Sequence, residues 1–172
     1  MKEFDKALNK YGKYVIQQSR SNLTREDKAG GNLYNNLSYN IEDNHVVFTG
    51  EYYGKFVDEG VRGKTSYYSK SANSPFRFGT GTGKKGGLTR GISSWIKRKG
   101  IRGRVQKGWK GSKGKGGRFI SHKSLTFLIA RSVYNHGLRA THFFSKPFER
   151  GVNKYGDEMI EGYFNDNIKT FK

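Results

Sequence analysis

The alternation of apolar and polar residues predicts a long helix at each end of the chain. Near the start, apolar side chains recur at spacings of three or four, the repeat of one helix face. They are Phe4, Leu8, Tyr11, Val15 and Ile16. This face is expected to pack in the core, with a contact to another subunit as the alternative.

The final segment, residues 148–171, repeats this helical pattern. Its apolar positions are Val152, Tyr155, Met159, Ile160, Tyr163, Phe164 and Ile168. Gly156 and Gly162 weaken it, because glycine is a poor helix former. A second long helix is therefore expected at this end.

After the first helix, the pattern changes to one typical of strands. Residues 37–41 and 45–49 are β-prone runs on either side of Asp43 and Asn44, residue types that favour a tight turn. An antiparallel pair is therefore expected here. The next run, 52–60, is rich in aromatic residues and fits either a short strand or a helical turn.

Two shorter helices are expected in the middle of the chain. Residues 88–101 carry Leu88, Ile92, Trp95 and Ile96 at helical spacing. Gly100 is placed to end that helix. A second apolar face, ended by residues 135–137, consists of Leu125, Leu128, Ile129, Ser132 and Val133. These elements predict an α+β fold, with a small antiparallel sheet packed against N-terminal and C-terminal helices and long Gly/Lys-rich loops.

Two of those loops, 79–87 and 107–118, consist largely of glycine and lysine. They have too few apolar groups to offset the entropy lost on ordering, so both are expected to be mobile until a partner binds. They belong to a flexible basic insertion around 61–123. The whole chain, 1–172, is otherwise expected to form a single domain.

Charge is distributed unevenly along the chain. The net charge is +19, yet no Asp or Glu occurs between Gly60 and Phe148, where 21 of the 33 basic residues lie. Because such a field fades within about 10 Å at moderate salt, something negative is expected close to this segment. The residues expected to face a neighbouring protein or DNA are Lys84, Lys85, Lys97, Arg98, Lys99, Arg102, Arg104, Lys107, Trp109, Lys110, Lys113, Lys115 and Arg118.

The residue types that catalysis needs are sparse. Without cysteine there is no thiol nucleophile or cysteine-bound zinc, and the four histidines have no metal-binding spacing. A carboxylate pair would need Asp58 or Glu59 and a distant partner such as Glu149. The glycine-rich run 79–85 fails as a phosphate-binding loop, because Lys85 rather than Ser or Thr follows Lys84. No catalytic, metal or cofactor site is therefore predicted.

Membrane insertion is not predicted either. The start of the chain lacks the apolar stretch of a signal peptide, and nowhere is there the run of about 18 apolar residues that a membrane helix needs. The protein is expected to be made in a cytoplasm and to have no membrane partner.

Five segments in order along the chain resemble the tail-completion, or head–tail joining, proteins of tailed bacteriophages. They are residues 31–38, 53–60, 95–101, 127–134 and 137–148. Each is a weak signal alone, but together they cover most of the chain. The sequence departs from the family at Gly54, where alanine is usual, at Pro147, where alanine is frequent, and in the length of the loop 107–118.

The resemblance implies a structural virion protein, made in the host bacterial cytoplasm and placed in the neck between head and tail. Such a protein forms a ring, expected to be a hexamer, that completes the tail and contacts the tail tube and the connector proteins near the portal. Its basic loops would reach an adjacent ring or the genomic DNA in the channel. The alternative is a small nucleic-acid-binding protein that binds independently of sequence.

Overall fold

The computed structural model describes residues 3–28, 30–65, 73–80, 87–105, 117 and 119–170, without the side chains of residues 169 and 170. The described residues form six helices and four short strands, which confirms the α+β class. They divide into two compact units, unit 1 (Met1–Gly60 with Arg139–Lys172) and unit 2 (Val61–Leu138). The predicted insertion, around 61–123, falls within unit 2.

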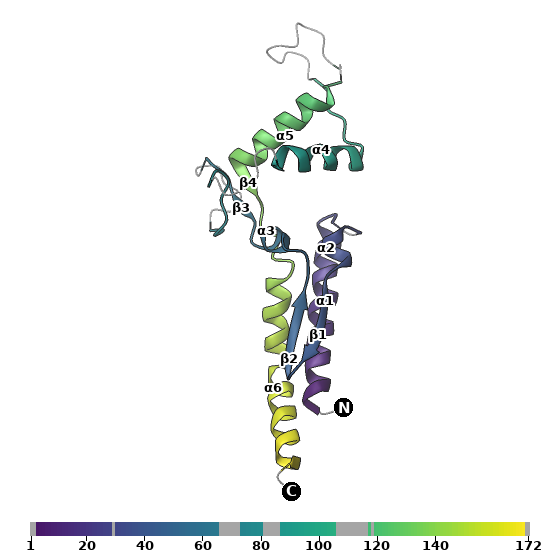
Figure 1. Cartoon of the computed structure of the whole chain (residues 1–172), viewed down its shortest axis with the longest axis vertical. Coiled ribbons are helices and arrows are strands. Elements are labelled where there is room, and N and C mark those ends of the chain that lie inside the picture. Colours follow the sequence, from purple (N-terminus) through teal and green to yellow (C-terminus); the bar gives the residue numbers. More distant parts are fainter. Residues whose placement is uncertain are drawn as a thin grey trace. The chain divides into compact units, whose positions relative to one another are not determined.

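Unit 1 consists of two long helices and a hairpin with two short helical turns. Its elements are α1 (Glu3–Arg25), α2 (Asn32–Asn35), β1 (Ser38–Glu42), β2 (His45–Thr49), α3 (Gly54–Asp58) and α6 (Ser145–Thr170). Helices α1 and α6 lie side by side and run in opposite directions (Figure 1). Edge-to-face ring pairs join them, with centroids 5.4 Å apart for Phe4–Tyr163 and 5.6 Å apart for Tyr14–Tyr155. Both predicted long helices are confirmed.

The predicted hairpin is also confirmed, with its first strand shifted by one residue. Strands β1 and β2 pair from Ser38–Thr49 to Glu42–His45. Asp43 and Asn44 turn the chain with positive φ angles of 46° and 67°, as a tight hairpin requires.

The core of unit 1 confirms that the apolar face of α1 packs within the chain. The positions predicted for this face are buried, except for Phe4, which is half-buried. The central cluster of buried residues consists of Ile16, Leu23, Leu33, Leu37 and Phe143. This core thus joins α1 to α2 and to the residues just before β1 and α6.

The aromatic run 52–60 contains a helical turn, α3. The last residue of α3, Asp58, fixes the start of α6 through hydrogen bonds. The carboxylate of Asp58, only 8% exposed, accepts hydrogen bonds from the backbone N–H groups of Phe144 (2.8 Å) and Ser145 (3.3 Å). The first N–H groups of a helix lack partners within it, and Asp58 supplies one from another part of the chain. This explains why α6 begins three residues before the predicted start. Pro147 fits there because the first turn needs no N–H donor.

Gly162 has a packing role that its low helix propensity conceals. A Cβ at this position would lie 2.9 Å from the backbone nitrogen of Phe4, so glycine lets α6 approach the start of α1. Gly156, by contrast, faces open space. Helix α6 continues through both glycines because its contacts with α1 offset their poor propensity.

Unit 2 contains β3 (Val61–Arg62), α4 (Gly87–Lys99), α5 (His122–His136) and β4 (Gly137–Leu138). Strands β3 and β4 pair antiparallel, Val61 opposite Leu138 and Arg62 opposite Gly137. The periodicity of the sequence did not predict this pair, because two residues are too few to show an alternation. The two helices were predicted, and Gly100 ends α4 with a φ of 64°.

The helical face predicted for α5 is partly buried and partly exposed. Leu125, Ile129 and Val133 are half-buried, but Leu128 is 41% exposed and Ser132 is also exposed. The residues that α5 buries most are Thr126 and Ala130. The most buried positions of α5 thus lie next to Leu125 and Ile129 and outside the predicted set.

Tyr11 gives unit 1 a testable dependence on pH. Its side chain is 5% exposed and packs edge-to-face against Phe48 and Phe148, and its hydroxyl has no hydrogen-bond partner in the described part of the chain. Burial disfavours the phenolate and raises the pKa of Tyr11 from 10.0 to about 12. The folded chain therefore holds this proton at pH values where the unfolded chain releases it.

We expect Tyr11→Phe to be about 1 kcal/mol more stable at pH 8, because it removes a buried hydroxyl without a partner. The contribution that the raised pKa of Tyr11 makes to the free energy of unfolding is complete below pH 10 and is lost as the pH rises towards 12. Between pH 8 and 11 the parent chain should therefore lose about 1.4 kcal/mol more than the variant. Urea unfolding of both proteins at both pH values measures this, and equal losses would contradict it.

Candidate functional site

The described members of the predicted interaction set lie at and just after the end of α4. Lys97, Arg98 and Lys99 form its last turn, Arg102 and Arg104 follow, and all five are exposed. Cations at a helix C-terminus also interact favourably with the helix dipole, so the first three have a structural role as well. The other members lie outside the described residues: Lys84, Lys85, Lys107, Trp109, Lys110, Lys113, Lys115 and Arg118.

Arg104 is held by a local structure. Its guanidinium lies 4.7 Å from the ring centroid of Phe119, within the range of a cation–π interaction. The backbone N–H of Ile120 donates to the carbonyl of Gly103 at 2.8 Å, which brings the two segments together. Arg104 and the half-exposed Phe119 therefore present one cationic and aromatic surface.

Unit 2 holds its basic residues without any acidic ones. No Asp or Glu occurs in Val61–Leu138, so none of its Lys or Arg side chains has a carboxylate partner within the unit. Mutual repulsion of these cations costs stability, and an anionic partner would relieve it.

The arrangement of polar groups offers little for catalysis. Ser93 of α4 and His122 of α5 form a hydrogen bond of 2.9 Å between Oγ and Nε2. A serine nucleophile also needs a group that orients the histidine, and unit 2 has no carboxylate to do so. The pair therefore ties α4 to α5. In the ranges described, no three His, Asp or Glu side chains are grouped so that they could hold a metal ion.

Comparisons with protein-family models, curated proteins and solved structures gave no significant match. Among the described residues, no helix has both the length and the apolar character needed to span a membrane. The interaction surfaces must therefore be identified from their own chemistry.

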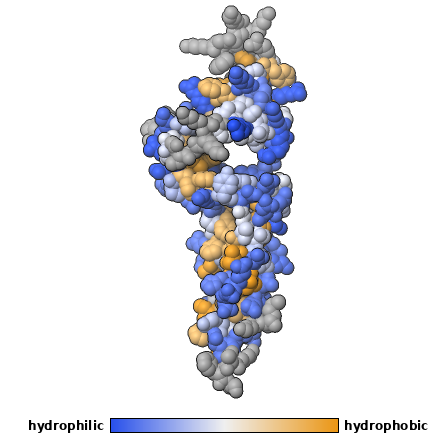
Figure 2. Space-filling model, viewed as in Figure 1, coloured by the Kyte–Doolittle hydropathy of each residue, from blue (hydrophilic) through white to orange (hydrophobic). Residues whose placement is uncertain are grey.

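Helix α6 exposes a stripe of large apolar side chains. In its second half, Ile160 (57%), Phe164 (59%) and Ile168 (57%) recur every four residues and are more than half exposed. Two exposed carboxylates, Asp157 and Glu161, each precede a member of this stripe by three residues and so lie beside it on the helix surface. These five residues form what we term the α6 face. Figure 2 shows apolar side chains at the molecular surface among hydrophilic ones.

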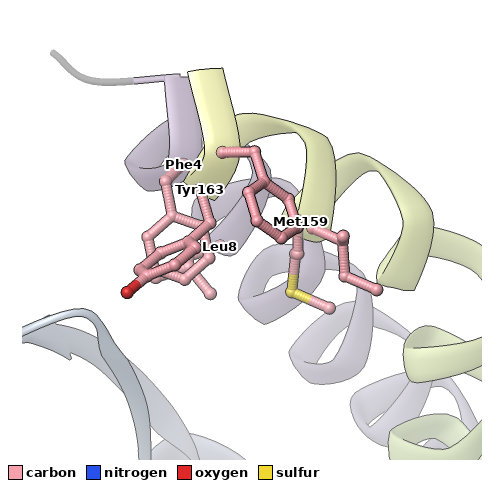
Figure 3. Close-up of a pocket in the computed structure, with 6 residues that line it drawn as sticks. Phe4, Leu8, Met159 and Tyr163 are labelled. Carbon is pink, nitrogen blue, oxygen red and sulfur yellow. The ribbon is translucent and has the colours of Figure 1, made fainter. Parts of the chain in front are cut away.

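A shallow groove adjoins the α6 face. Its volume is about 310 Å³, and its lining is entirely apolar: Phe4, Leu8, Met159, Ile160, Tyr163 and Phe164. The lining comes from the start of α1 and the second half of α6, and the rings of Phe4 and Tyr163 lie against each other (Figure 3). Because the groove offers no polar group to orient a small ligand, an apolar side chain from a protein partner fits it better.

Helix α5 of unit 2 presents a second exposed apolar group. Phe127 is 59% exposed and Leu128 is 41% exposed. Lys123 and Arg131 lie one helical turn before and after Phe127, and both are exposed. These four residues form what we term the α5 face, which has a basic rim where the α6 face has an acidic one.

Sequence analysis missed both faces, although each left a signal. The predicted stripe of the last helix has apolar residues on too wide an arc for one buried face, since Met159 and Ile160 are neighbours and so are Tyr163 and Phe164. In α5, Phe127 falls outside the face predicted from Leu125 and Ile129. A single such residue is ordinary on a protein surface, whereas several contiguous ones outside the main stripe indicate a second contact.

Proposed function

We propose that this chain is a structural subunit of the neck of a tailed bacteriophage, where copies form a ring that completes the tail and joins it to the head connector. The observation that carries the proposal is the exposed apolar stripe of α6, in which Ile160, Phe164 and Ile168 are each more than half exposed. Monomeric proteins rarely leave so much apolar surface in contact with water, so the helix has the character of an assembly surface.

Two of the segments that resemble the tail-completion family also meet in the fold. The carboxylate of Asp58 accepts hydrogen bonds from the start of α6. The backbone N–H of Thr141 donates to the carbonyl of Val57 at 3.2 Å, and the backbone N–H of His142 donates to the carbonyl of Asp58 at 2.9 Å. Residues 57–58 and 141–145, which lie within those two segments, thus have a shared structural role in unit 1.

The ring and its place in the virion can be tested together. Quantitative mass spectrometry of purified virions of the source phage should give about six copies of this protein per particle, or a small multiple. Labelling with an antibody should place it at the junction of head and tail. Absence from virions, with recovery on intracellular nucleic acid, would overturn the proposal.

The specific observation that favours a second function is the absence of acidic residues from unit 2. Lys97, Arg98, Arg102 and Arg104 are exposed, and the guanidinium of Arg104 lies over the aromatic ring of Phe119. Cations of this kind fit the phosphates of nucleic acid, and an exposed ring can stack on its bases. This function predicts tight binding of the isolated chain to DNA or RNA at physiological salt, with an affinity that falls steeply as salt rises. Filter binding over a range of salt concentrations measures both properties.

A further inference from the structure

The two exposed faces are complementary in chemistry. The α6 face combines Ile160, Phe164 and Ile168 with the carboxylates of Asp157 and Glu161. The α5 face combines Phe127 and Leu128 with the cationic groups of Lys123 and Arg131. Each has an apolar centre and a charged rim, the composition of a protein–protein interface, and the two rims are opposite in sign.

We propose that the α6 face of one copy binds the α5 face of a second copy, so that copies associate head to tail. A contact between two different faces of identical chains leaves one of each face unused at the ends of every oligomer. Further copies can therefore add, and a contact of this kind forms a ring when its rotation closes and an open filament when it does not. The inference rests on the proposed ring and assigns the surfaces that build it.

Charge decides between a second copy and other occupants of the α6 face. The acidic rim formed by Asp157 and Glu161 repels nucleic acid and anionic membranes. The basic rim of the α5 face attracts this acidic rim. In the described part of the chain, neither carboxylate has an ion-pair partner: the ion pairs are Lys10–Glu158 and Lys28–Glu26. Asp157 and Glu161 are thus available to a neighbouring copy.

The groove beside the α6 face gives the contact its apolar anchor. Ile160 and Phe164 belong both to the α6 face and to the lining of the groove, so a side chain that packs on them can enter it. Phe127 is the largest exposed apolar residue of the α5 face. An aromatic side chain inserted into an apolar pocket is a common energetic centre of interfaces. We assign that role to Phe127 of the neighbouring copy.

Charge reversal and compensation test the pairing. We expect the full chain to form oligomers in analytical ultracentrifugation. The pair Asp157→Lys and Glu161→Lys should weaken association by at least about tenfold, and so should the pair Lys123→Glu and Arg131→Glu, because each brings like charges together. All four substitutions in one chain should restore association. The control pair Glu26→Lys and Glu42→Lys removes two acidic side chains elsewhere in unit 1 and should leave association unchanged.

Cross-linking tests the contact directly, because the chain has no cysteine. Chains with Asn165→Cys, next to Phe164 on α6, are mixed with differently tagged chains that carry Ser132→Cys, one helical turn after Leu128 on α5; both residues are exposed, and the apolar and charged groups of the two faces stay intact. A short bismaleimide is added, and a cross-linked species that contains both tags is expected. The matched control replaces Asn165→Cys by Tyr52→Cys, since Tyr52 is 81% exposed in unit 1 but outside the α6 face; it should give none.

Several outcomes would overturn the inference: a parent chain that stays monomeric, reversed variants that associate normally, or a fourfold variant that stays dissociated. Circular dichroism confirms that each variant is folded. A ring that forms normally despite the reversals would refute these faces while leaving the neck function intact. Conversely, restored association by the fourfold variant, together with absence of the protein from virions, would support the faces and refute the neck function.

Discussion

Replacing Gly137 by alanine is expected to destabilise unit 2 strongly. Gly137 has a φ of 80°, which is strained for any residue with a Cβ, and that Cβ would lie 2.1 Å from the carbonyl oxygen of Val61. It would also lie 2.6 Å from the nitrogen of Gly63, so the obstacle on both sides is backbone that cannot move aside. Strain and displacement together should cost about 3 kcal/mol or more.

Unit 2 is expected to have a low free energy of unfolding, because it buries few apolar side chains. In the described ranges, its buried apolar side chains are only Val61, Ile96 and Ala130. Both tryptophans of the chain, Trp95 and Trp109, belong to this unit, so their fluorescence reports its unfolding in urea. The transition should move to a much lower urea concentration in the variant.

Gly91→Ala is the matched control for this experiment. Gly91 lies in α4 of the same unit, and a Cβ there meets nothing within 4 Å. Alanine should therefore stabilise the helix by about 0.5–1 kcal/mol. If Gly137→Ala gave the same tryptophan transition as Gly91→Ala, the close crossing of β3 and β4 would not be essential to unit 2.

Asp58→Ala is expected to give the second large effect, a loss of about 2–3 kcal/mol from unit 1. The substitution leaves the N–H groups of Phe144 and Ser145 without their acceptor at the partly buried start of α6. It also removes a negative charge from the positive end of the helix dipole. Amide hydrogen exchange in the first turn of α6 should speed up more than exchange in the middle of α1.

Two further variants isolate the cause of that loss. Asp58→Asn keeps an oxygen acceptor but removes the charge, so it should recover about half of the loss. Glu59→Ala removes the neighbouring carboxylate, which is exposed, and should change stability by less than about 0.5 kcal/mol. Equal effects of Asp58→Ala and Glu59→Ala would show that Asp58 does not hold the start of α6.

Asp58 shows the limit of motif reasoning for this chain. The sequence drew attention to residues 53–60 because they resemble a family segment, and Asp58 was considered there only as a member of a carboxylate pair. Its actual partners are 86 and 87 residues away in the sequence. No local pattern marks a helix cap that comes from a distant segment, because capping signals are read within a few residues of the helix start.

The charged surface was the part of the candidate site most accessible to sequence analysis. The absence of Asp and Glu from the middle of the chain is a property of composition, and the exposure of Lys97, Arg98, Lys99, Arg102 and Arg104 agrees with it. The apolar parts of the α6 and α5 faces were less accessible. A stripe such as Ile160, Phe164 and Ile168 has the same spacing whether it faces the core, a partner or water.

The sequence by itself determined the elements that depend on short-range chemistry. Apolar periodicity determined α1, α4, α5 and α6. Asp43 and Asn44, residue types that tolerate a positive φ, determined the hairpin, and Gly100 determined where α4 ends. The tertiary structure decided which apolar stripe each helix buries, that β3 and β4 pair across 74 intervening residues, and that Asp58 caps α6. Periodicity and turn preference act between neighbours in the chain, whereas these features depend on packing between segments that the sequence separates.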